Sequence, residues 1–206
     1  MKARLVRPFL GISFALALGF ATVVSLSASA GSPAKGRIEG TVSYHRGDKG
    51  LLVYVVKAPG HFAAPKKDPL MNQSHMHFVP HVLPVLEGST VTFLNSDAIA
   101  HNVFSPDHEG YNLGSWGQGE KRTYTFKKAG VYTQLCSLHP EMEAYVVVLQ
   151  NPYYATTDAH GHFVIKGVPD GHYELKVWGE KLHSKEKKKH VSVDLKGGAA
   201  KVSINL

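Results

Sequence analysis

The sequence has few cysteines and few long apolar runs, and each shortage limits what the protein can be. It contains 206 residues and a single cysteine, Cys136. One thiol cannot form an internal disulfide framework, so Cys136 is either an inert buried side chain or a ligand. After an apolar run near the start, no segment is long and apolar enough to span a bilayer. We therefore expect no stable membrane insertion once that first run is removed.

Residues 1–30 have the three parts of a secretory signal peptide. Lys2, Arg4 and Arg7 form a positive head, an apolar run follows, and the small-x-small sequence ASA ends at Ala30. We predict cleavage after Ala30 and a periplasmic or secreted protein. The alternative is an uncleaved anchor, because the apolar run is near the minimum length for spanning a bilayer.

The chain that remains after cleavage of residues 1–30 carries only a small net positive charge. Removal of residues 1–30 lowers the formal net charge from +7 to +4, and the basic residues gather mainly in KLHSKEKKKH, residues 181–190. No arginine-rich face and no basic patch with interleaved aromatic residues occurs, which argues against a nucleic-acid partner. The basic run is typical of a solvated hairpin loop, and the alternative is a docking patch for an acidic redox partner or an anionic membrane surface.

Helical periodicity is nearly absent, and short runs of β-branched and aromatic residues alternate with Gly, Pro, Asn and Asp. Examples are STVTFLN, AYVVVL and HYELKVW. This pattern predicts an all-β protein with two β-modules, one over residues 69–150 and one over residues 153–206. The strands expected in residues 37–58 are too few to fold alone and must pair with one of the two modules.

The cysteine lies in the segment QLCSLHPEM, together with His139 and Met142. His101 follows an expected strand, TVTFLN, upstream. One thiolate, two imidazoles and a weak methionine ligand are the set that forms a blue-copper electron-transfer site. The pattern therefore predicts one copper ion on His101, Cys136, His139 and Met142, with zinc as the competing metal that methionine disfavours. Asn102 is expected to hydrogen-bond across to the cysteine loop and hold the two loops together.

Alternatives to this copper site remain open. In one, Cys136 is a buried thiol, His139 is an ordinary surface residue and Met142 is core packing. His75, His77 and His81 lie in SHMHFVPH, and the first two are expected to share one face of a strand. They form either an extra metal site, for copper or zinc, or a solvated strand edge.

Two stretches, FVPHVLPVLEGSTVTFLNSDAIAHNV and YTFKKAGVYTQLCSLHPEM, resemble the cupredoxin family of small blue copper proteins. The Cys-x-x-His-x-x-Met spacing is similar to that of its amicyanin members. The resemblance implies a Greek-key β-sandwich with a single type 1 copper ion. It also implies that electrons pass through His139, with Leu138 and Pro140 forming the surface on which a redox partner docks. Such a partner is a cytochrome c, a dehydrogenase or an oxidase.

A third stretch, TTDAHGHFVIKGVPDGHYELKVW, resembles the carboxypeptidase regulatory-like, or transthyretin-like, β-sandwich, which is grouped with carbohydrate-binding-like folds. GRIEGTVSY and GLLVYVV resemble the first two strands of that sandwich. This implies that the cupredoxin module is inserted into the second sandwich, the alternative being that residues 37–58 extend the cupredoxin sheet. Residues 37–182 as a whole resemble exported proteins labelled methylamine utilization or plastocyanin-like proteins.

These observations favour an exported carrier of single electrons that catalyses no reaction. A copper storage or delivery protein is the first alternative, in which the additional histidines load the metal. A carbohydrate-binding or adhesion module is the second, and it depends on the C-terminal resemblance alone. A multicopper oxidase is disfavoured, because it needs several copper sites and paired His-x-His motifs, and the chain has one His–Cys set.

Overall fold

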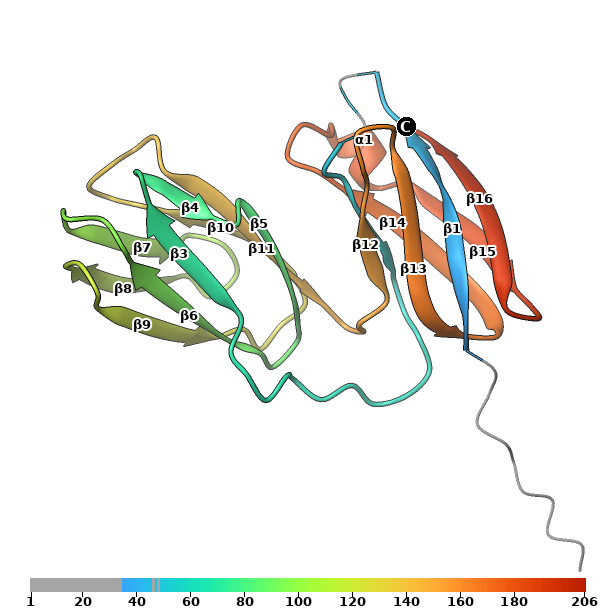
Figure 1. Cartoon of the computed structure of the whole chain (residues 1–206), viewed down its shortest axis with the longest axis horizontal. Coiled ribbons are helices and arrows are strands. Elements are labelled where there is room, and N and C mark those ends of the chain that lie inside the picture. The colour runs from blue at the N-terminus through green and yellow to red at the C-terminus, as the bar shows by residue number, and fades with distance from the viewer. Residues whose placement is uncertain (1–34, 46, 48) are drawn as a thin grey trace, which may run out of the picture. The chain divides into compact units, whose positions relative to one another are not determined.

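The computed structural model describes residues 35–45, 47 and 49–206, and the expected signal peptide lies outside these residues. The described part contains sixteen strands and a four-residue helix, α1 (Ser184–Lys187) (Figure 1). The all-β prediction is therefore confirmed. No helix within this part has the length and apolar character needed to cross a membrane.

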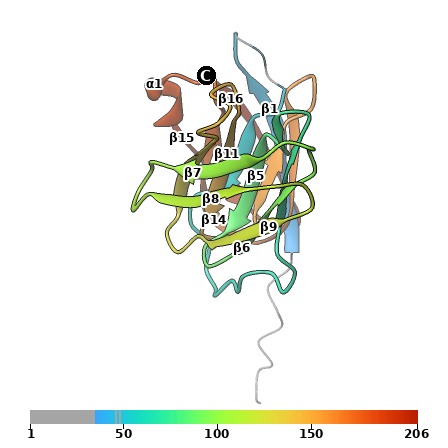
Figure 2. The same ribbon diagram turned by 90° about the vertical axis from the view of Figure 1, so that its left-hand side faces the viewer.

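Nine consecutive strands form a two-sheet structure that we call the central sandwich. Its two sheets have the strand orders β4-β3-β6-β9 and β5-β11-β10-β7-β8, and Figure 2 shows β7 beside β8. Inward-facing side chains alternate along the strands, as in β6, where Val91, Phe93 and Asn95 are buried. The strands are β3 (Leu70–Ser74), β4 (His77–Val79), β5 (Val82–Leu86), β6 (Thr90–Asn95), β7 (His101–Ser105), β8 (Tyr111–Trp116), β9 (Lys121–Thr125), β10 (Gly130–Leu135) and β11 (Glu143–Leu149).

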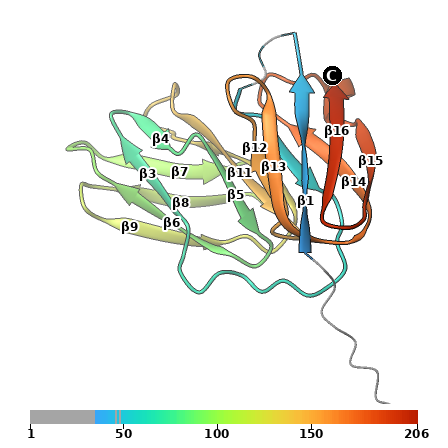
Figure 3. The ribbon, with the colours of Figure 1, turned by 45° about the vertical axis from the view of Figure 1, so that its right-hand side comes forward.

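The other seven strands form the outer sandwich, and they come from both sides of the central sandwich in the sequence. Its sheets have the orders β13-β1-β16, seen side by side in Figure 3, and β12-β2-β14-β15. β1 and β2 thus have all their strand partners here, not in the central sheets. The strands are β1 (Lys35–Ser43), β2 (Leu52–Val55), β12 (Tyr154–Thr156), β13 (His162–Pro169), β14 (Gly171–Trp178), β15 (His190–Leu195) and β16 (Ala199–Asn205).

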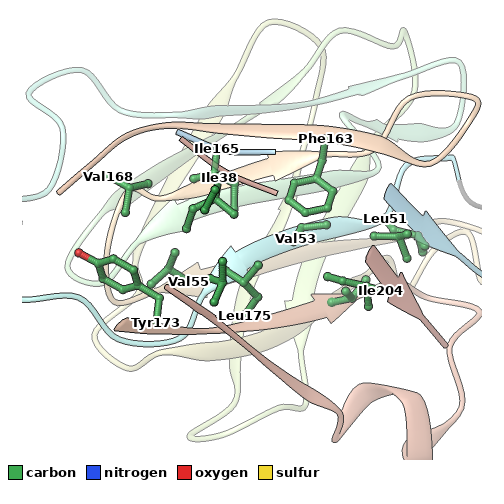
Figure 4. Close-up of a cluster of buried hydrophobic side chains, with 14 of the residues drawn as sticks. Ile38, Leu51, Val53, Val55, Phe163, Ile165, Val168, Tyr173, Leu175 and Ile204 are labelled. Atoms are coloured by element: carbon green, nitrogen blue, oxygen red, sulfur yellow. The ribbon is translucent and has the colours of Figure 1, made fainter. Parts of the chain in front are cut away.

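The interior of the outer sandwich is an apolar cluster between its two sheets (Figure 4). Ile38 from β1, Phe163 from β13 and Leu175 from β14 are nearly or fully buried in it. Gly40 permits the close approach of β1 and β16, because a Cβ at this position would lie 1.9 Å from the carbonyl oxygen of Val202. The motif residues that suggested this fold therefore act through packing and close backbone contact.

A smaller buried cluster contains side chains of both sandwiches. Leu52 and Trp178 come from the outer sandwich, and Val147 and Leu149 come from β11. The Tyr145 ring meets the Trp178 ring edge to face, with centroids 5.1 Å apart. Apolar contact therefore continues from β11 into β2 and β14.

Candidate metal centre

Three potential ligands converge at one end of the central sandwich. His101 is the first residue of β7, Cys136 follows β10 directly, and His139 lies in the loop before β11. Their ligand atoms all lie within 4.8 Å of one another. The two imidazole Nδ1 atoms are 3.0 Å apart, and Cys136 Sγ is 3.7 Å from His139 Nδ1. One thiol and two imidazole nitrogens therefore face the same point.

Three of the four candidate ligands are nearly or fully buried. His101 is fully buried and Cys136 is 3% exposed, whereas His139 is half-buried. Met142 is 1% exposed and belongs to the same apolar cluster as Cys136. Its backbone N–H donates a hydrogen bond to the His139 carbonyl oxygen at 3.0 Å, which closes the loop into a turn. Within the three converging ligands, His139 is thus the one that reaches the surface.

A bulge in β7 explains why two adjacent residues, His101 and Asn102, are both buried. The register with β8 shifts between Asn102 and Phe104. In a regular strand, successive side chains point to opposite faces, and a bulge changes the direction of one of them. His101 can therefore face the cysteine while Asn102 turns to the neighbouring loop.

Asn102 joins the two loops that carry the candidate ligands. Its Oδ1 accepts a hydrogen bond from Ser137 N at 3.2 Å, and its own backbone N–H donates to Cys136 Sγ at 3.4 Å. Its Nδ2 donates to Asn112 Oδ1 at 2.9 Å and to the Gly114 carbonyl oxygen at 2.8 Å. These bonds fix the distance between β7 and the cysteine loop, and the N–H bond stabilises negative charge on the sulfur.

Asp97 is a residue of this site that sequence reasoning missed. Its Oδ2 lies 2.8 Å from His101 Nε2. A carboxylate at this position accepts a hydrogen bond from Nε2–H, so the lone pair of the imidazole is on Nδ1, which faces Cys136 and His139. The spacing of Asp97 and His101 is four residues in a loop, and this spacing alone carries no signal for such a contact.

The electrostatics of Asp97 follow from its hydrogen bonds. Burial alone would raise its pKa, but the N–H of Met76, the His101 side chain and the N–H of His75 together hold the pKa below its usual range. The carboxylate accepts these bonds at 2.9 Å from Met76 N and 2.6 Å from His75 N. Asp97 is therefore an anion that ties the β3–β4 connection to His101.

The expectation that His75 and His77 share one strand face is wrong. His75 and Met76 form a two-residue turn between β3 and β4, with φ angles of 54° and 59°. Ser74 and His77 pair across the ends of the two strands, so the chain reverses direction between the two histidines. The segment was predicted as a strand because turn residues such as Gly and Asn are absent from it.

None of the three additional histidines belongs to the converging group. Within the described residues, the His, Cys, Asp and Glu side chains that form such a group are those of His101, Cys136 and His139. His81 instead places Nε2 2.9 Å from Glu180 Oε2 and stacks edge to face on Tyr145.

Leu138 and Pro140 are exposed on either side of His139, with Leu138 49% exposed. Trp116 is 3% exposed at the end of β8, and the Arg122 guanidinium lies 5.4 Å from its ring centroid.

The two-sheet sandwich and its His–Cys–His group define a class, the copper-binding cupredoxins. Residues 68–149 match the family described as copper binding proteins, plastocyanin/azurin family. This segment is therefore a copper-binding domain of that family. Residues 128–202 match polysaccharide lyase family 4, domain II, a range that includes β10 and β11 as well as most of the outer sandwich.

Several solved structures resemble part of the chain. A reduced amicyanin variant is 27% identical with a TM-score of 0.39, over 41% of this chain and 84% of that protein. A purple cupredoxin from Nitrosopumilus maritimus is 28% identical with a TM-score of 0.36, over 39% of this chain and 99% of that protein. A copper-containing nitrite reductase from Thermus scotoductus is 28% identical with a TM-score of 0.40, over 46% of this chain and 25% of that protein. A comparison with curated proteins gave no significant match.

Proposed function

We propose that the protein is a type 1 copper electron carrier and that His101, Cys136, His139 and Met142 hold its copper ion. The observation that carries this proposal is the convergence of Cys136 Sγ and two imidazole Nδ1 atoms within 4.8 Å. This donor set fits copper, since thiolate and thioether sulfur suit Cu(I) and imidazole suits both oxidation states. The bound copper supplies a one-electron couple.

The protein residues supply rigidity and access. Asn102 and Asp97 fix the two loops, so the ligands need little rearrangement when the charge of the site changes by one. His139 is the half-buried ligand, and exposed Leu138 and Pro140 flank it. This supports electron transfer through the His139 imidazole to a partner that docks on the apolar surface around it. The partner is a redox protein such as a cytochrome c, a dehydrogenase or an oxidase.

The domain arrangement follows the strand pairing. We propose that residues 37–58 and 153–206 form one regulatory-like sandwich and that residues 69–150 are the cupredoxin domain inserted into it. The antiparallel pairing of β1 with β13 and of β2 with β14 supports this division. We also propose export to the periplasm or beyond, and the sequence pattern of residues 1–30 supports it.

The test of this function is the visible absorption spectrum of the copper(II)-loaded protein. An intense blue band from thiolate-to-copper charge transfer is expected, and Cys136→Ala should abolish it. His172→Asn, a change on the exposed surface of the outer sandwich, is the control and should leave the band intact. A protein that binds copper without this band would favour the alternative of copper storage or delivery, to which the exposed histidines of the β3–β4 turn lend support.

A further inference from the structure

The β3–β4 turn has an unusual composition for its backbone conformation. His75 and Met76 both lie in the left-handed region, with φ of 54° and 59°. Two-residue hairpin turns of this type strongly prefer Asn-Gly, because bulky side chains are strained there. Among the described residues, His108 is the only other non-glycine residue with positive φ. A strained pair of side chains at a turn points to a role for those side chains themselves.

Asp97 holds this turn in place from outside the hairpin. Its carboxylate accepts hydrogen bonds from the backbone N–H groups of His75 and Met76. The same carboxylate bonds to His101 Nε2. The turn is therefore a fixed platform, joined through one side chain to a candidate copper ligand.

The histidines of the turn have nitrogen atoms available for a metal. His77 Nδ1 lies 2.6 Å from the carbonyl oxygen of His75, which can only accept, so Nδ1 carries the proton and Nε2 carries the lone pair. His75 Nδ1 lies 3.0 Å from the hydroxyl of Ser74, which can accept the same kind of bond and leave Nε2 free. A hydrogen bond on one ring nitrogen is the usual way in which a metal-binding imidazole is oriented.

Met76, which lies between the two histidines in the sequence, adds a soft ligand type. Its side chain is 38% exposed, whereas Met71 and Met142 are buried in the core. Two imidazoles and one thioether form a donor set that suits copper, above all Cu(I). His75 and His77 are also exposed, so the set is open to solvent.

We propose that His75, Met76 and His77, which we call the turn triad, form a surface copper site that accepts Cu(I) and passes it to the buried centre. The second part of this proposal rests on the proposed function. Transfer exchanges the Nε2 and Sδ bonds of the triad for bonds to the buried ligands. The Cys136 thiol releases its proton to water, and the oxidation state of copper does not change.

The stoichiometry of Cu(I) binding tests the site. The purified protein is titrated with Cu(I) against a chromophoric Cu(I) chelator, and two bound equivalents are expected. The double variant His75→Asn/Met76→Gly should bind one equivalent. Because Asn-Gly is the preferred sequence for this turn and Asp97 binds only its backbone N–H groups, the variant should fold as well as the wild type. His77→Gln, which leaves the turn sequence intact, should also bind one.

The outer sandwich supplies a matched control. His160 and His162 have the same His-x-His spacing, with ring centroids 6.1 Å apart, but Gly161 lies between them in place of methionine. His160→Asn/His162→Gln should still bind two equivalents. A wild type that binds one equivalent and shows the blue band on oxidation, or a turn variant that binds as much Cu(I) as the wild type, would overturn the site. The blue band reports the buried centre separately, so its absence would contradict the proposed function and not the turn triad.

The transfer step has its own readout. One equivalent of chelated Cu(I) is added, samples are oxidised at intervals, and the growth of the blue band is followed. Loading should be slower in His75→Asn/Met76→Gly than in the wild type and unchanged in His160→Asn/His162→Gln. Equal loading rates in all three proteins would overturn the transfer.

Discussion

The two sandwiches of this chain share a layered β architecture but differ in what their interiors contain. Of the buried polar residues that the structure describes, seven lie in the central sandwich, including Gln73, His101 and Asn102. The other two belong to the outer sandwich: Asn151 precedes β12 and donates to the Val55 carbonyl oxygen, and Thr157 follows β12 and accepts from Leu51 N. The comparison indicates that one sandwich uses part of its interior for a site and the other uses it for stability.

The largest expected effect is the loss of the copper site in the central sandwich on removal of its cysteine. Cys136→Ala removes the only thiol and should abolish the blue band and greatly weaken copper binding, because the thiolate is the strongest ligand of the proposed set. Absorption spectroscopy and metal analysis measure both. Met142→Leu keeps the buried volume and should retain a blue, copper-binding protein with altered redox properties, since its thioether is a weak ligand. A Cys136→Ala protein that stayed blue would refute the ligand assignment.

The next effect is on stability, in the outer sandwich. Phe163 is 3% exposed in the apolar cluster. Phe163→Ala should lower the free energy of unfolding by about 3–5 kcal/mol, because it removes the apolar contacts and leaves a cavity. Denaturant unfolding measures the change. The blue band of the folded fraction should keep its position and intensity per bound copper. A spectrum altered by this substitution would mean that the two interiors are coupled.

A matched pair of buried asparagines sharpens the comparison. Asn102 and Asn151 are 2% and 1% exposed, and each side chain bonds to backbone groups. Asn102→Ala should lower copper affinity by roughly 10–100-fold, since it releases the cysteine loop. Asn151→Ala should destabilise the fold by about 1–3 kcal/mol through the unpaired Val55 carbonyl, with copper affinity unchanged. Copper competition and unfolding measurements on both variants would show whether the effects separate in this way.

The smallest expected effect is on how the stability of the outer sandwich depends on pH. The backbone N–H groups of His162 and His160 hydrogen-bond to Asp158 and lower the pKa of its carboxyl. A lowered pKa in the folded state means that the ionised group stabilises the fold above its unfolded pKa. This contribution disappears as the pH falls through the folded pKa. Asp158→Asn should therefore be slightly less stable than the wild type at neutral pH and equal to it in acid. A difference that persisted in acid would refute the electrostatic cause.

The sequence predicted the parts of the fold and site that depend on residue type and spacing. Alternation of apolar and polar residues predicted the strands, and the spacing of Cys136 and His139 predicted their loop. The place of Asn102 next to His101 predicted its hydrogen bond to the cysteine loop. Asp97 could not be predicted, because its contact with His101 depends on how the β6–β7 loop folds back. The turn at His75 and Met76 was predicted as a strand, since neither residue type favours a left-handed conformation. Local patterns are informative where the chain follows local preferences, and this turn does not.

The central claim is that one cysteine sulfur and two histidine nitrogens bind the same copper ion. X-ray absorption at the copper edge of the singly loaded protein tests it directly, because it reports the atoms around the metal. We predict one short copper–sulfur distance and two imidazole nitrogens, with the short sulfur contact absent in Cys136→Ala. Copper surrounded by nitrogen and oxygen alone in the wild type would contradict the account.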